Sequence, residues 1–89
     1  MILGKVVGTV WATRKDEELV GMKFLLVKHV DLDYKVKDPF VVAVDTVQAG
    51  AGDVVLVTSG SSARQTAQTK NKPVDAVIVT VVDKLDVAD

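Results

Sequence analysis

Five short runs rich in apolar residues occur along this chain, and side chains that fall on two faces with a period of two predict a β-strand for each run. The runs cover residues 5–13, 22–30, 40–47, 54–59 and 76–85. Charged, polar or glycine-bearing segments separate them, at 14–18, 31–39, 48–53 and 70–73. The alternation stops after Gly60, where a serine cap followed by Ala, Arg and Gln predicts one or two turns of helix over 61–67. We therefore expect an all-β fold, a small barrel or sandwich with one short helix.

The residue types within the runs support strands. Valine supplies 20 residues, and Val, Ile and Thr together supply 29 of 89, the branched types that suit a pleated surface. Glycine weakens a strand interior, so Gly4 and Gly8 indicate a bend or a close approach of another backbone. Pro39 falls where no backbone hydrogen needs to be donated to a neighbouring strand.

Several runs are apolar on both faces, although one face of an antiparallel sheet is normally polar. The chain is short enough to form only one domain, residues 1–89, and it has no cysteine to form a disulfide. A chain of this size buries roughly 63% of its surface on folding, yet 48% of its residues are hydrophobic. No helices are available to cover a second apolar face. We therefore expect this chain to bury apolar surface against copies of itself.

The charge balance argues against nucleic acid and membrane partners. Eleven basic and twelve acidic residues leave a net charge of -1, without the basic footprint of a nucleic-acid-binding protein. The four aromatic residues are too few and too scattered for a base-stacking platform. No apolar run approaches the roughly 18 residues of a membrane span, and the first residues do not resemble a secretory signal. These features predict a soluble, cytoplasmic protein.

No motif predicts catalysis, a metal or a cofactor. His29 is the only histidine and has no cysteine or second histidine with which to bind zinc. The Gly50–Gly52 segment lacks the third glycine and the following helix of a dinucleotide site. Gly60–Arg64 carries arginine where a nucleophile elbow needs glycine. Val44–Val47 lacks the final glycine of an aspartic-protease turn, so a small hydrolase using Asp45 or the serines is the least favoured alternative.

Two loops still carry polar residues that can act at a subunit contact. Asp45 stands at the end of a strand, where its carboxylate can accept hydrogen bonds from the backbone or from Arg64. Ser61 and Ser62 can cap the short helix, or can present hydroxyl and N–H groups around an opening. Arg64 is one of only two arginines and could donate to a carboxylate of the same or an adjacent chain.

Read together, these motifs resemble a known family. The segments that carry the resemblance are 4–15, 19–27, 42–57, 60–65 and 73–83, and the Ala43-Val44-Asp45 and Gly60-Ser61-Ser62-Ala63-Arg64 motifs at this spacing are the most specific. The chain resembles the EutN/CcmL family of bacterial microcompartment vertex proteins over nearly its whole length. Gln48 and Thr80 depart from this pattern, because the family often has glycine at these positions, and Asp53 replaces the usual glutamate.

The resemblance implies a five-stranded barrel related to the OB-fold and a cyclic homopentamer without catalytic activity. Such pentamers close the five-fold vertices of a protein shell whose faces are built from hexamer-forming proteins. The resemblance and the small loops together suggest seven residues at the subunit interface or near the five-fold axis: Asp45, Gly50, Gly52, Asp53, Ser61, Ser62 and Arg64. The alternative is an OB-like binding module for single-stranded nucleic acid, against which the acidic balance argues.

Overall fold

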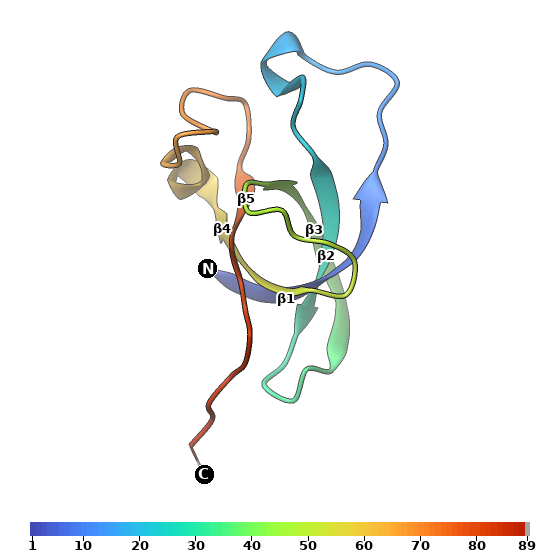
Figure 1. Cartoon of the computed structure of the whole chain (residues 1–89), viewed down its shortest axis with the longest axis vertical. Coiled ribbons are helices and arrows are strands. Elements are labelled where there is room, and N and C mark those ends of the chain that lie inside the picture. The colour runs from blue at the N-terminus through green and yellow to red at the C-terminus, as the bar shows by residue number, and fades with distance from the viewer. Residues whose placement is uncertain (89) are drawn as a thin grey trace.

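The strands of this chain close into a barrel with the order β1-β2-β3-β5-β4 (Figure 1). The structure is a computed structural model and describes residues 1–88. Its strands are β1 (Ile2–Val10), β2 (Phe24–Val30), β3 (Val36–Asp45), β4 (Val54–Ser59) and β5 (Ala76–Val81). All neighbours pair antiparallel except β3 and β5, which run parallel. The predicted all-β, five-stranded barrel is confirmed.

The inward positions of the alternating strands build the core. Leu25 and Val27 of β2 are buried, and so are Val55 and Val57 of β4. They pack with Val6, Ala43, Ala49, Ala76 and Ile78 in one cluster inside the barrel. Burial of these aliphatic side chains stabilises the fold by about 1.5–3 kcal/mol for each of the larger ones. The period of two in the sequence separates these residues from their outward neighbours, but it did not indicate which of the two apolar faces is the inner one.

A second apolar cluster lies outside the barrel, and the chain covers this part of its own surface. Val44 of β3 and Val77 of β5 pack there against Ala63 and Val74 from the connection between β4 and β5. The expectation that nothing within the chain covers the second face is therefore wrong for this part of β3 and β5. An irregular connection, and not only a helix, can cover the outer face of a sheet.

Both ends of β1 and the end of β5 differ from the predicted ones because pairing partners set them. β1 begins and ends three residues earlier than the predicted run, since Ile2–Lys5 pairs with β4 and β2 offers no partner beyond Phe24. β5 ends at Val81, and only the Val82 N–H continues the pairing, 2.7 Å from the Val54 carbonyl oxygen. The last predicted run, 76–85, is therefore too long.

β3 begins at Val36, four residues before the predicted run and inside the segment predicted as a turn. The register between β2 and β3 shifts between Lys28 and Val30, which leaves extra residues on β3 opposite His29. Pro39 lies in this irregular part of the ladder, where its missing N–H is tolerated. The position of Pro39 was predicted correctly, but the strand extends past it.

The predicted short helix is a single 3₁₀ turn, η2 (Gly60–Arg64), and the loop after β1 contains a second one, η1 (Glu17–Leu19). The residue at the cap position of η2 is Ser59, and its side chain makes no capping hydrogen bond. The predicted serine cap is therefore wrong, and Ser61 and Ser62 lie within the turn instead. Asp16 does cap η1, because its carboxylate accepts the Glu18 N–H at 2.9 Å.

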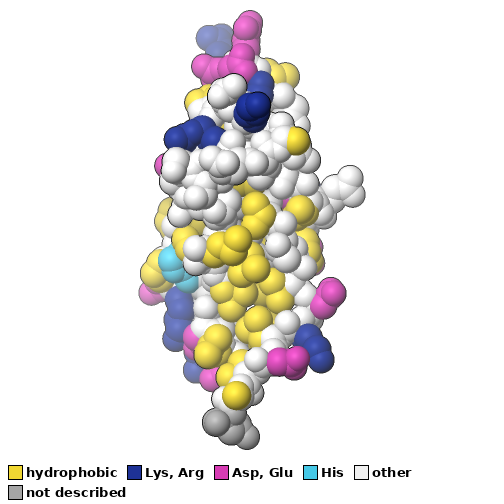
Figure 2. All heavy atoms as spheres, turned by 90° about the vertical axis from the view of Figure 1, so that its left-hand side faces the viewer, with side chains coloured by type: hydrophobic (Ala, Val, Ile, Leu, Met, Phe, Trp, Pro, Cys, Tyr) yellow, Lys and Arg dark blue, Asp and Glu magenta, His cyan; other side chains and the backbone are white. Residues whose placement is uncertain are grey.

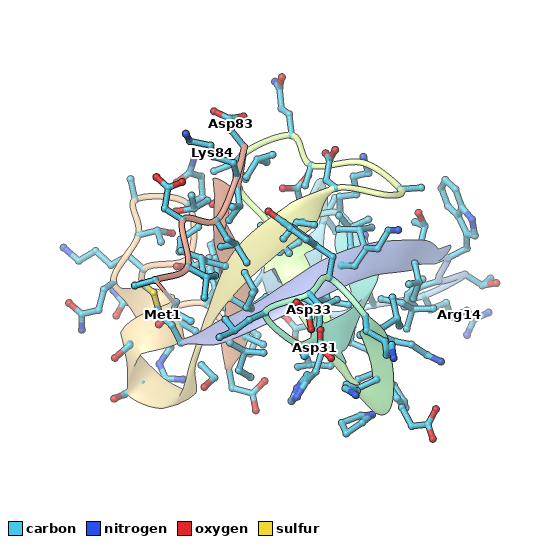
Figure 3. The ribbon with its side chains drawn as sticks, turned by 90° about the horizontal axis from the view of Figure 1, so that it is seen from below. Met1, Arg14, Asp31, Asp33, Asp83 and Lys84 are labelled. Atoms are coloured by element: carbon cyan, nitrogen blue, oxygen red, sulfur yellow. The ribbon has the colours of Figure 1, made fainter. Side chains whose placement is uncertain are left out.

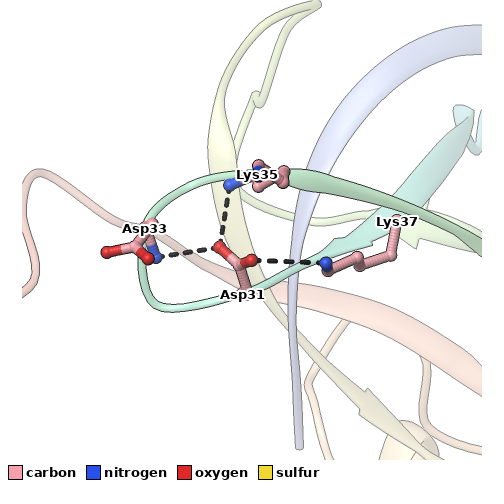
Figure 4. Close-up of polar contacts among 4 residues, drawn as sticks. All are labelled: Asp31, Asp33, Lys35 and Lys37. Carbon is pink, nitrogen blue, oxygen red and sulfur yellow. Dashed lines mark hydrogen bonds and ion pairs between the residues drawn. The ribbon is translucent and has the colours of Figure 1, made fainter.

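The β2–β3 hairpin loop is organised by one carboxylate (Figure 4). The Asp31 side chain accepts the backbone N–H groups of Asp33 and Lys35, both at 2.9 Å, and lies 3.4 Å from the Lys37 ammonium group. These contacts, foremost the Lys35 N–H, hold the pKa of Asp31 below its usual value, and its partial desolvation opposes them. Tyr34 adopts a left-handed conformation in this loop, and its hydroxyl accepts the Leu85 N–H at 3.0 Å.

Candidate subunit-contact surfaces

The turn between β3 and β4 begins at Asp45, one of the predicted contact residues. Its Oδ1 accepts the backbone N–H groups of Val47 at 3.0 Å and Ala49 at 3.2 Å. Gln48, between these two residues, has a φ of 60°. Glycine adopts this left-handed conformation at no steric cost, so the departure at Gln48 falls where the backbone favours glycine. The backbone bonds predicted for Asp45 are thus present and hold the turn in place.

The second half of this turn is closed by Asp53. Its Oδ2 accepts the Gly50 N–H at 2.8 Å, and its own N–H donates to the Gly50 carbonyl oxygen at 3.0 Å. Gly52 has a φ of 90°, which a residue with a side chain rarely adopts. The Gly52 N–H donates to the Val6 carbonyl oxygen at 2.8 Å, which fixes the turn against β1. Gly50, Gly52 and Asp53 therefore form one rigid, small-residue turn.

The η2 segment lies outside the barrel and exposes its polar side chains. Ser61, Ser62 and Arg64 are exposed, whereas Ala63 between them is buried in the second cluster. The Arg64 Nη1 donates to the Val74 carbonyl oxygen at 3.1 Å, and the Gly60 N–H donates to the Asp75 carbonyl oxygen at 2.8 Å. These bonds hold η2 onto the connection that leads to β5.

The seven predicted contact residues thus fall into two groups, the 45–53 turn and η2. Among the residues that the structure describes, no ion pair joins Arg64 to Asp45. Asp45 uses its Oδ1 on the backbone of its own turn, and Arg64 donates to the backbone of its own connection. A contact between Arg64 and Asp45 of an adjacent chain stays a prediction.

The outer surface of β1, β2 and β3 is apolar and uncovered. Cross-strand pairing places Gly8, Leu26 and Val42 in one row, and it places Lys28 beside Phe40 in the next row. The exposed fraction is 63% for Phe40, 43% for Val42 and 46% for Val7. We call this surface the β2 face; its apolar members are Val7, Leu26, Phe40 and Val42.

A second apolar surface lies on the other side of β1, where β4 pairs with the first residues of β1. Leu3 pairs with Leu56 and Lys5 with Val54, all on the outside because Val55 and Val57 point into the core. Figure 2 shows hydrophobic side chains gathered over the middle of the side that carries β4. We call this surface the β4 face; its members are Met1, Leu3, Val54 and Leu56.

The two faces flank β1, where Lys5 pairs with Lys28 of β2 and with Val54 of β4. The first residues of β1 pair with β4, and its later residues pair with β2. In the view of Figure 3, Met1 and Arg14 accordingly lie on opposite sides of the molecule. One chain therefore presents two neighbouring apolar surfaces with Lys5 and Lys28 between them.

The described residues show no sign of a metal centre or a membrane-spanning helix. No group of three or more His, Cys, Asp or Glu residues within 1–88 is close enough to hold a metal ion. In the same part of the chain, no helix has the length and apolarity needed to cross a membrane.

Comparison with known proteins identifies the family. The sequence pattern of the family described as "Ethanolamine utilisation protein EutN/carboxysome" matches residues 1–83. The chain belongs to the EutN/CcmL family. Two relatives in this family are the carboxysome shell vertex protein CcmL of Thermosynechococcus vestitus and the microcompartment shell vertex protein GrpN of Rhodospirillum rubrum. The first is 40% identical over 93% of this chain and 84% of its own length, and the second is 43% identical over 97% of both chains.

Solved structures of the EutN/CcmL family share the barrel. The structure described as the GrpN pentameric microcompartment shell protein from Rhodospirillum rubrum has a TM-score of 0.89 and 42% identity, and the match covers 99% of this chain and all of that one. Gloeobacter violaceus CcmL has a TM-score of 0.92 and 40% identity, over 98% of this chain and 90% of its own. The resemblance seen in the sequence is therefore confirmed.

The sequence did not reveal the two apolar faces. It showed that several strands are apolar on both sides, but not which outer parts stay uncovered. The signal for the β2 face was present in the alternation of Phe40, Val42 and Val44. The structure separates them: Val44 is buried beneath the β4–β5 connection, and Phe40 and Val42 are exposed.

Proposed function

We propose that this chain is a structural protein of a bacterial microcompartment shell, and that its homopentamers close the five-fold vertices. One observation carries the proposal: the barrel and the sequence match, over nearly the full chain, relatives named as shell vertex proteins. The exposed apolar residues of the β2 face, Val7, Phe40 and Val42, support it, because monomeric proteins rarely expose large apolar patches. In this proposal the protein is located in the shell and meets hexamer-forming shell proteins around the vertex.

The 45–53 turn and η2 fit positions near the five-fold axis or at the contact between subunits. Both are short, rich in small residues and held by hydrogen bonds within their own chain. A rigid, small loop suits a crowded axis. Five copies of the loop approach one another there, and a loop that is already ordered loses little conformational entropy when they do. Asp45, Gly50, Gly52, Asp53, Ser61, Ser62 and Arg64 therefore remain our proposed contact residues.

We propose no enzymatic activity for this chain, since no nucleophile, base and orienting group were recognised together in its sequence. The names of the relatives lend no support to the alternative of an OB-like module for single-stranded nucleic acid. The net charge of -1 also disfavours this alternative, because phosphate neutralisation supplies most non-specific affinity.

Imaging of shells tests the proposed function. Shells assembled from hexamer-forming shell proteins with and without this chain should differ at their vertices in electron micrographs. With the chain, we expect closed shells with one five-fold cap at each vertex; without it, we expect openings there. Shells that close equally well without the chain, or that never incorporate it, would contradict the proposal.

A further inference from the structure

Trp11 lies directly after β1 and is 89% exposed, the most exposed of the large hydrophobic side chains in residues 1–88. β1 ends at Val10, opposite Phe24 of β2, so the chain leaves the barrel there. The loop 11–23 then forms the end of the molecule that lies opposite the segment 82–88 (Figure 1). Tryptophan is mostly buried in folded proteins, and it is enriched among the residues that contribute most to protein–protein binding. An exposed tryptophan at this end therefore indicates a surface that contacts another molecule.

A hollow of about 240 Å³ opens beside Trp11. Lys15 and Lys23 line it, and its apolar lining comes from Val10, Trp11, Met22 and Phe24. Among the described residues that line the hollow, none is acidic. Neither lysine forms an ion pair within residues 1–88. The hollow thus combines an apolar, partly aromatic wall with two cations that no carboxylate neutralises there.

Contacts within the loop 11–23 hold this hollow in shape. The Lys15 Nζ donates to the Met22 carbonyl oxygen at 3.2 Å and lies 5.0 Å from the centre of the Phe24 ring. The Met22 N–H donates to the Leu19 carbonyl oxygen at 3.1 Å. Leu19, Met22 and Phe24 also pack against the second apolar cluster. A surface that is already ordered loses little entropy on binding, so the hollow is a preformed site.

The acidic residues of the same loop are engaged away from the hollow. The Asp16 Oδ1 accepts the Glu18 N–H at 2.9 Å, and the Glu18 carboxylate lies 2.7 Å from the ammonium group of Lys72 in the β4–β5 connection. Asp16 and Glu18 line a different cavity, and neither they nor Glu17 line the hollow. The loop therefore separates its charges, with its acids toward the connection and its lysine at the hollow.

We propose that the hollow beside Trp11 binds a short acidic segment of another protein, one that places an apolar side chain next to a carboxylate. The apolar side chain packs against Trp11 and Phe24, and the carboxylate pairs with Lys15 and Lys23. Charge complementarity selects an acidic segment over a basic one. A nucleic acid fits less well, because the acidic residues 16–18 follow Lys15 directly and repel a row of phosphates. The site lies within one chain, so this proposal does not depend on the proposed pentamer.

Trp11 reports directly on this site, because it is the only tryptophan of the chain. The probe is the peptide acetyl-Glu-Leu-Asp-Phe-Glu-amide, titrated into the native protein up to about 1 mM. We expect a saturable shift of the fluorescence emission maximum to shorter wavelength, since the indole ring leaves water. The analogue acetyl-Gln-Leu-Asn-Phe-Gln-amide keeps the apolar side chains without the charges. It should give no saturable shift in the same range.

Lysine variants assign the binding to the hollow, with folding checked by circular dichroism. Lys15→Glu should raise the Kd of the acidic peptide at least about tenfold, and Lys23→Gln should raise it about threefold, because each removes an attractive charge. Lys84→Glu is the matched control, since it changes the net charge as Lys15→Glu does. The Lys84 side chain is 77% exposed and lies in the segment after β5, outside the hollow. Its Kd should equal that of the native chain.

Each of the other outcomes would overturn the proposal. These outcomes are no shift with the native chain, equal binding of the amide analogue, an unchanged Kd for Lys15→Glu, or an equal loss for Lys84→Glu. If Lys15→Glu does not fold, an unchanged Kd for Lys23→Gln overturns it instead. A short-wavelength maximum before peptide is added, lost on dilution, would show that a second copy covers the hollow. An equal shift with a short oligothymidine would assign the hollow to nucleic acid.

Discussion

Gly4→Ala should strongly destabilise the barrel. A Cβ atom at this position would lie 2.7 Å from the Lys28 carbonyl oxygen and would overlap the Val27 side chain. Gly4 pairs with His29 of β2 and with Val55 of β4, so the backbone cannot withdraw from one strand without disturbing the other. We expect the free energy of unfolding to fall by about 3 kcal/mol or more, a large share of the stability of a small domain. Urea denaturation followed by circular dichroism measures this loss.

Gly8→Ala is the matched control on the same strand. Its Cβ would lie 3.2 Å from the Cδ1 atom of Leu26, which is the mobile end of a side chain. Leu26 can move by a few tenths of an ångström, so the expected loss is below about 1 kcal/mol. Equal losses in the two variants would show that the close approach at Gly4 is not what constrains β1.

Leu25→Ala should destabilise the barrel by about 2–5 kcal/mol, the usual cost of truncating a buried leucine. Leu25 is 1% exposed and belongs to the cluster inside the barrel. The surrounding aliphatic side chains come from several paired strands, so they cannot collapse fully into the space left behind. Urea denaturation of dilute protein, below the concentration at which copies associate, measures the change in the single chain.

The neighbouring residue provides the contrast. Leu26 has the same side chain but points outward to the β2 face, where it is half-buried. Leu26→Ala should lower the free energy of unfolding of the dilute chain by no more than about 1 kcal/mol. At equal folded fraction, Leu26→Ala should weaken assembly more than Leu25→Ala does. A larger loss of chain stability from Leu26→Ala than from Leu25→Ala would reverse the inner and outer assignment of β2.

The sequence predicted the five strands because apolar, β-branched residues form five short runs separated by polar or glycine-bearing segments, although it did not show which face is the inner one. Leu25, Val27, Val55 and Val57 point into the core, as the period of two requires. The ends of the strands depended on their partners. Ile2 belongs to β1 because β4, more than fifty residues later, pairs with it, and no local pattern carries that information.

The contact surfaces were predictable only in part. The sequence indicated that Asp45 can accept backbone hydrogen bonds and that Gln48 stands where the family often has glycine. The structure explains both, because Asp45 accepts two backbone N–H groups in a turn where Gln48 is left-handed. The sequence also indicated surplus apolar surface. It could not show that Ala63 and Val74 cover Val44, since that depends on how η2 folds back onto β3 and β5.

The central claim is that the apolar surface left outside the barrel closes five copies into a ring. Native mass spectrometry of the unmodified chain at low micromolar concentration tests it most directly. The account predicts a dominant species with five times the 9.5 kDa mass of the chain. A single-chain mass that persists to tens of micromolar would contradict it.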